Sequence, residues 1–97
     1  MDHDAMRRSA DAAIVPLVAS LAPWGVVEAH WLPDRNGEPV LWVRVGTELQ
    51  RVTLEAQSWL LPQLHVILAR MGMPSEKVMG SRLEVTSAEA EKRLSEE

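Results

Sequence analysis

The chain of 97 residues contains no cysteine, no phenylalanine and no tyrosine. Without cysteine it can form no disulfide, no thiolate nucleophile and no zinc–thiolate site. No apolar run approaches the ~18 residues that a membrane-spanning helix needs. The acidic start Met1-Asp2-His3-Asp4 is unlike a signal peptide. We therefore expect a cytoplasmic protein with no membrane segment.

Motifs that carry chemistry are also missing. There is no G-x-S-x-G or S-x-x-K nucleophile motif, no phosphate-binding loop and no dinucleotide-binding glycine pattern. The three histidines, His3, His30 and His65, do not have the spacing of metal ligands. The sequence therefore predicts a protein that is not an enzyme, with no catalytic residues, no metal and no cofactor.

The net charge is −4 and the isoelectric point is near 5.3. Proteins that bind nucleic acid through bulk charge are basic, so nucleic acid is not the expected partner. An acidic surface suits a partner protein that is itself basic.

The length fits a single domain over residues 1–97. Residues 4–22 carry apolar side chains at spacings of three and four, which predicts an amphipathic helix. Pro16 lies inside it, and we expect it to kink or split that helix because proline removes a backbone hydrogen bond.

Two apolar segments, residues 26–32 and 40–45, flank a turn with Asp34 at its first position and Gly37 at its fourth. This pattern is typical of a three-residue hairpin loop with a glycine bulge. The turn fixes the register of the strands, and the register assigns each side chain to one face of the sheet. The expected pairs on the apolar face are Trp31–Leu41, Ala29–Val43 and Val27–Val45, and those on the other face are Glu28–Arg44, His30–Trp42 and Leu32–Val40.

The second half of the chain continues with a tight turn at Gly46-Thr47 and a third strand over residues 48–53. A second helix then opens at Thr53 or Leu54 and runs to about Met71, with a break at Pro62.

A fourth strand is predicted at residues 78–85. Thr86 and Glu89 are spaced as a capping box for a short terminal helix. We expect residues 1–4 and 88–97 to be the least firmly held parts of the domain. The predicted order is α-β-β-β-α-β-α. It describes a two-layer α+β fold with an antiparallel sheet of three to four strands packed against two helices.

The non-core face of the hairpin is the candidate site. Trp31 points to the core in this register, whereas Trp42 points to the opposite face. An exposed tryptophan beside arginines is typical of a binding hot spot. The alternative is that the terminal helix or an arginine side chain covers Trp42, so that it is not available for binding. The candidate binding residues are Trp42, Arg44, His30, Glu28 and Arg51.

Glu28, His30 and Arg44 could also form an acid–base site. No nucleophile lies beside them, and a Glu28–Arg44 surface pair is the simpler interpretation.

Two segments are informative together with the order of elements, namely Leu41-Trp42-Val43-Arg44-Val45 and Leu83-Glu84-Val85-Thr86-Ser87. In its order of elements and in these two segments, the chain resembles the N-terminal domain of the bacterial ribosome maturation factor family. The resemblance covers roughly residues 10–88 and implies a role in small-subunit assembly. By topology and acidic charge the chain also resembles the small dimeric chaperones of type III secretion effectors.

The leading expectation is a non-enzymatic protein-binding module of the adaptor, chaperone or inhibitor type that forms a homodimer. Large apolar side chains are more numerous than one small core needs, and methionine adapts well to interfaces. The alternatives are a ribosome-assembly or RNA-associated accessory protein and a secretion-effector chaperone.

Overall fold

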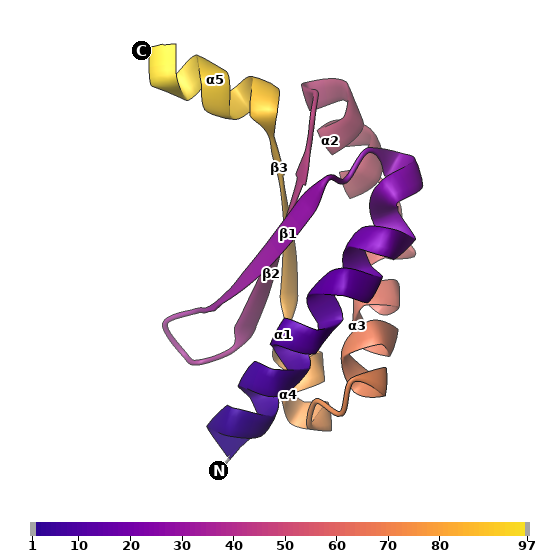
Figure 1. The fold of residues 1–97 in the computed structure, drawn as a ribbon, viewed down its shortest axis with the longest axis vertical. Coiled ribbons are helices and arrows are strands. Elements are labelled where there is room, and N and C mark those ends of the chain that lie inside the picture. Colours follow the sequence, from indigo (N-terminus) through magenta and orange to yellow (C-terminus); the bar gives the residue numbers. More distant parts are fainter. Residues whose placement is uncertain (1, 97) are drawn as a thin grey trace.

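The computed structural model describes residues 2–96, and the side chains of residues 4–95. The chain folds into five α-helices, one short 3-10 helix and three strands within these residues (Figure 1). In chain order these are α1 (Asp2–Leu21), η1 (Ala22–Trp24), β1 (Glu28–Pro33), β2 (Pro39–Val45), α2 (Glu48–Glu55), α3 (Leu60–Arg70), α4 (Ser75–Gly80), β3 (Arg82–Ser87) and α5 (Ala88–Glu96).

The strands form one sheet in the order β1-β2-β3, so β2 is central. The predicted α+β class is confirmed. The prediction of an all-antiparallel sheet is wrong, because β1 runs antiparallel to β2 whereas β3 runs parallel to it. Parallel neighbours need a crossover connection, and the segment from α2 to α4 provides it.

The hairpin forms in the predicted register, with Trp31 opposite Leu41 and His30 opposite Trp42. The prediction that Val27 lies on the apolar face is wrong, because Val27 precedes β1 and is 69% exposed. Gly37 adopts a φ of +80°, as the bulge at this loop requires. The Asp34 carboxylate accepts hydrogen bonds from the backbone N–H groups of Asn36 and Glu38, at 2.8 and 3.0 Å. Local turn chemistry therefore sets the geometry of the whole β1–β2 ribbon.

The predicted third strand over residues 48–53 is wrong, because these residues form α2. Thr47 caps the helix: its hydroxyl accepts from the N–H of Gln50, and the Gln50 side chain accepts from the N–H of Thr47. This reciprocal capping box stabilises a helix start and directs the chain away from a strand.

The predicted helix up to Met71 is two helices, because α2 ends at Glu55 and α3 begins at Leu60. Pro62 lies in the first turn of α3, where its missing N–H costs no hydrogen bond. The start of the predicted strand at residues 78–85 is wrong as well, since α4 occupies residues 75–80. Pro16 does not split α1, which continues as one helix of 20 residues.

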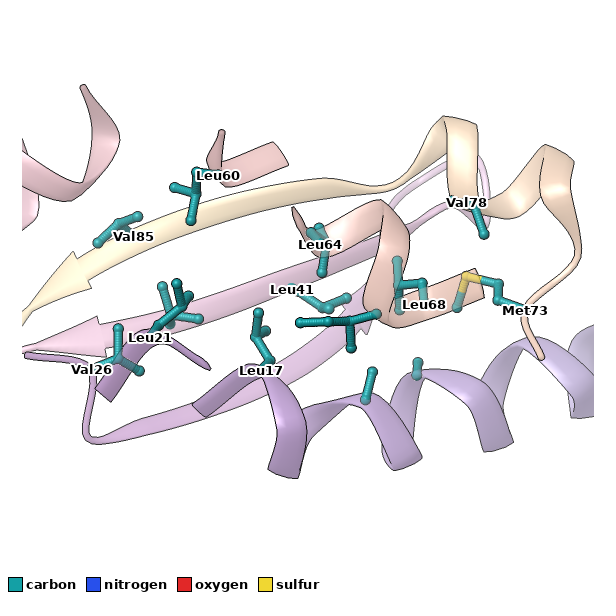
Figure 2. Close-up of a cluster of buried hydrophobic side chains, with 14 of the residues drawn as sticks. Leu17, Leu21, Val26, Leu41, Leu60, Leu64, Leu68, Met73, Val78 and Val85 are labelled. Atoms are coloured by element: carbon teal, nitrogen blue, oxygen red, sulfur yellow. The ribbon is translucent and has the colours of Figure 1, made fainter. Parts of the chain in front are cut away.

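The core lies between the sheet and the helices α1 and α3, which cover the same face (Figures 1 and 2). Leu17 and Leu21 of α1 and Leu64 and Leu68 of α3 are fully buried against Leu41 of the central strand. These contacts fill one face of the sheet. In the described chain no helix is both long and apolar enough to cross a membrane.

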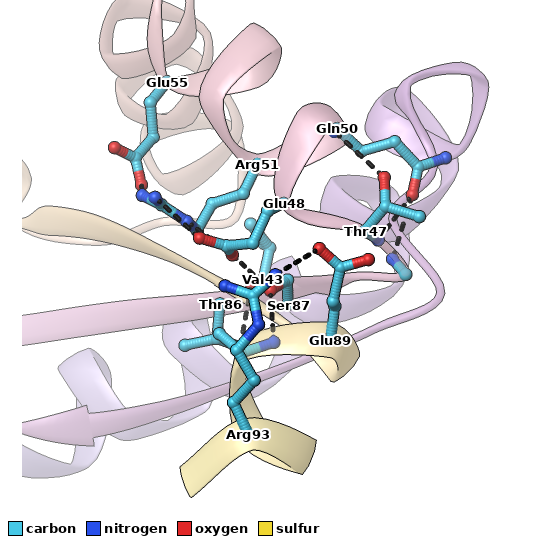
Figure 3. A network of polar contacts seen from close by, with 12 residues as sticks. Val43, Thr47, Glu48, Gln50, Arg51, Glu55, Thr86, Ser87, Glu89 and Arg93 are labelled. Atoms are coloured by element: carbon cyan, nitrogen blue, oxygen red, sulfur yellow. Dashed lines mark hydrogen bonds and ion pairs between the residues drawn. The ribbon is translucent and has the colours of Figure 1, made fainter.

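The terminal helix α5 is capped by Ser87 and not by the predicted pair Thr86 and Glu89. The Ser87 hydroxyl accepts from the N–H of Ala90 at 3.0 Å and donates to the carboxylate of Glu48. Figure 3 shows this hydroxyl between α2 and the start of α5. One buried serine therefore joins the end of the sheet to two helices.

Candidate functional site

The face of the sheet turned away from α1 and α3 is here called the outer face. Side chains alternate between the two faces along each strand, so the register determines its members. They are Glu28, His30 and Leu32 of β1, Val40, Trp42 and Arg44 of β2, and Arg82, Glu84 and Thr86 of β3.

Trp42 lies at the centre of the outer face, on the middle strand. Its ring stacks on His30 of β1, with centroids 6.2 Å apart and planes 5° from parallel. Trp42 is half-buried and stands outside the core cluster, while His30 and Glu84 on either side of it are exposed. The stack holds the indole in place and leaves part of it accessible, as suits a contact residue.

Trp31 lies on the opposite face, as the sequence predicts. It packs against the core cluster and its Nε1 donates to the carboxylate of Asp11 in α1 at 2.6 Å. The two tryptophans of the hairpin therefore face opposite sides of the sheet.

Arg44 is paired on both sides. Its guanidinium contacts the carboxylate of Glu91 in α5 at 2.7 Å and that of Glu28 in β1 at 3.2 Å. The hydrogen bond to Glu91 is the main reason that the pKa of Arg44 is raised. With two carboxylates already bound to it, Arg44 has little residual positive charge to offer an anionic ligand.

The terminal helix borders the outer face without lying along it. Figure 1 shows α5 projecting from the end of β3, away from α1 and α3. Its Glu91 reaches Arg44 at the end of the outer face. Trp42, two residues further into β2, forms its aromatic contact with His30.

The prediction that Arg51 belongs to this face is wrong. Arg51 lies in α2 and pairs with Glu48 at 2.9 Å and Glu55 at 2.8 Å (Figure 3). The sequence predicts residues 48–53 as a strand beside Trp42, and their helical conformation moves Arg51 off the sheet. The remaining candidates, Trp42, Arg44, His30 and Glu28, come together as the register predicts.

Sequence reasoning missed the contribution of β3 to this face. The alternation of Arg82-Leu83-Glu84-Val85 indicates a strand with a polar side. It does not indicate the neighbouring strand, so the placement of Glu84 opposite Trp42 and Arg82 opposite Val40 emerges only from the fold.

The arrangement offers little for catalysis. Glu28 is bound to Arg44, and His30 is stacked on Trp42. Among the described residues no group of three or more histidine, aspartate or glutamate side chains could hold a metal ion. His65 lies on α3, away from this face, and the side chain of His3 is outside the described part.

The chain matches no family model, no curated protein and no solved structure in the comparisons. These comparisons give no support to the resemblance to the ribosome maturation factor family, which stays a prediction from the sequence.

Proposed function

We propose that this chain is a non-enzymatic protein-binding module of the adaptor, chaperone or inhibitor type. It works in the cytoplasm, self-associates, and uses the outer face to bind another protein. The observation that carries this proposal is the half-buried Trp42, partly accessible at the centre of a sheet face that α1 and α3 leave uncovered.

Tryptophan is among the residues most enriched at interface hot spots. Trp42 is surrounded by a mixed rim with exposed Leu32 on one side and charged Glu28 and Glu84 on the others. Protein–protein interfaces typically have an aromatic or apolar centre surrounded by a polar rim, and this face has the same arrangement. The net charge of −4 favours a partner with a basic surface through electrostatic complementarity.

Capture of partners from lysate of the source cell tests the proposal with three baits: wild type, Trp42→Ala and Trp59→Ala. Trp59 is a matched control because it is a 37% exposed tryptophan away from the outer face. Its ring lies tilted at 54° against Trp24, with the ring centroids 5.3 Å apart. We expect a protein that wild type and Trp59→Ala retain and Trp42→Ala loses. Titration calorimetry with that purified protein then measures the loss directly.

The melting temperature of each bait shows whether it is folded. If folded Trp42→Ala captures and binds the same protein as wild type, the outer face is not the contact surface. A ribosomal protein among the specific captures would support the ribosome-assembly alternative, and a secreted effector would support the secretion-chaperone alternative.

A further inference from the structure

The open edge of β3 is a second feature with the form of an interface. Because β2 is central, β3 has a neighbour on one side only. A groove of about 420 Å³ lies beside it. One wall consists of five consecutive residues, Ser81 to Val85, and the other consists of Glu55, Gln57, Ser58, Leu60 and Leu61.

The lining shows where the groove runs. Successive side chains of a strand point to opposite faces, so a hollow over one face would touch every second residue. This groove touches Arg82 and Glu84 of the outer face as well as Leu83 and Val85 of the core face. It therefore follows the backbone edge of β3 itself.

The backbone along this edge is available for pairing. In a parallel ladder only every second residue of β3 directs its N–H and C=O groups to β2. Within residues 2–96, no backbone hydrogen bond joins residues 83–86 to any segment other than β2. The strand contains no proline and its register with β2 is continuous, so two of the devices that block an edge, a proline and a bulge, are missing from it.

The charged side chains on β3 are complementary to those on the β3 strand of a second copy that runs antiparallel to it. Arg82 and Glu84 stand two residues apart on the outer face, on either side of Leu83. In an antiparallel pair with its two-fold axis at Leu83, Arg82 of each copy lies opposite Glu84 of the other. A shift by two residues would instead place Glu84 opposite Glu84 of the second copy, and like charges directly opposite are unfavourable.

We propose that β3 is the homodimer interface: two copies pair edge to edge, antiparallel, with Leu83 on the axis and two reciprocal Arg82–Glu84 ion pairs. This inference rests on the self-association in the proposed function and names its surface. The second copy completes the open ladder, and on the core side it covers Leu61, which is 44% exposed in the groove wall.

Charge reversal tests the pairing by analytical ultracentrifugation over a range of protein concentrations. Wild type forms a dimer. Glu84→Arg and Arg82→Glu alone each oppose like charges and raise the dissociation constant at least about tenfold. An equimolar mixture of the two variants restores a dimer, because a strand with two arginines then faces a strand with two glutamates.

The matched controls are Glu76→Arg in α4 and Arg70→Glu in α3, which change the net charge equally at exposed positions off the groove. They dimerise like wild type. A monomeric wild type, single reversals that dimerise unchanged, or a mixture that does not associate would each overturn the proposal. The melting temperatures of Glu84→Arg and Arg82→Glu show that each variant is folded, and the Trp42→Ala capture experiment tests the outer face separately.

Amide hydrogen exchange supplies an independent readout. Exchange in residues 82–86 slows as protein concentration rises and dimer forms, since the edge amides become bonded to the second copy. Dimerisation that protects another segment and leaves these residues unchanged would locate the interface elsewhere.

Discussion

Ser87 donates a hydrogen bond to the Glu48 carboxylate, joining the last residue of β3 to the first residue of α2. Ser87 is fully buried, and its oxygen also accepts from the N–H of Ala90 in α5. This pair of residues fixes where the sheet ends and where the terminal helix begins.

Ser87→Ala removes both hydrogen bonds. The loss of the helix cap and of a buried partner lowers the free energy of unfolding by about 1–2 kcal/mol. Urea denaturation measures this change. Ser95→Ala is the control, because Ser95 is exposed and its hydroxyl donates to the carbonyl of Glu91. An equal effect in both variants would show that the Ser87 hydroxyl has no special role.

Stability depends on pH through Glu48. The hydrogen bond from Arg51, followed by that from Ser87, lowers the pKa of Glu48 from its ordinary 4.5 to about 2. Above pH 4.5 the Glu48 carboxyl is ionised in both the folded and the unfolded chain, and its contribution to the free energy of unfolding is complete. Between pH 4.5 and 2 the unfolded chain takes up the proton first, so stability falls as pH falls.

Glu48→Gln removes this titration. Denaturation curves at several pH values therefore show a shallower loss of stability for Glu48→Gln than for wild type between pH 4.5 and 2. Parallel pH profiles for the two proteins would contradict the assignment.

Gly37→Ala strains the hairpin loop. The φ of +80° disfavours any residue with a Cβ, although the added Cβ would meet no atom within 4 Å. The free energy of unfolding falls by about 1 kcal/mol for backbone reasons alone. Gly37→Asn loses less, because asparagine tolerates this conformation better. Thermal unfolding compares the two, and equal losses would argue against a conformational cause.

Trp31→Ala and Trp42→Ala separate the two faces of the hairpin. Trp31 packs on the core and bonds to Asp11, so its removal costs about 2 kcal/mol of unfolding free energy. Trp42 stands outside the core cluster, and its removal costs about 1 kcal/mol or less. Chemical denaturation ranks the two variants. A larger loss for Trp42→Ala would make Trp42 a structural residue.

The hairpin was predictable because its determinants are local. Asp34 and Gly37 define one turn, the turn fixes the register, and burial of one face excludes a shift by one residue. The positions of Trp42, His30, Arg44 and Glu28 on a common face followed from that register alone.

The second half of the chain was harder because two local patterns compete there. Residues 48–53 follow a tight turn, which suggests a returning strand, but Thr47 and Gln50 form a capping box that starts a helix. The spacing of Glu48, Arg51 and Glu55 at three and four residues is the helical signal that could have corrected the interpretation.

The parallel pairing of β3 and the groove beside it could not be predicted from local patterns. A strand's neighbour and direction depend on how the intervening helices pack, and residues 82–87 have no short turn that ties them to β2. The edge of β3, and with it the proposed dimer surface, therefore emerges only in three dimensions.

The residues that pair in the sheet differ widely in how far apart they lie in the sequence. Pro33 pairs with Pro39 across one loop, whereas Val40 pairs with Arg82, about 40 positions along the chain. Bringing the ends of so long a segment together costs conformational entropy before the contacts between them can form. Folds with such long-range pairs therefore fold more slowly than folds with mainly local contacts. We expect the ribbon of β1 and β2 to form early and the docking of β3 to limit the folding rate.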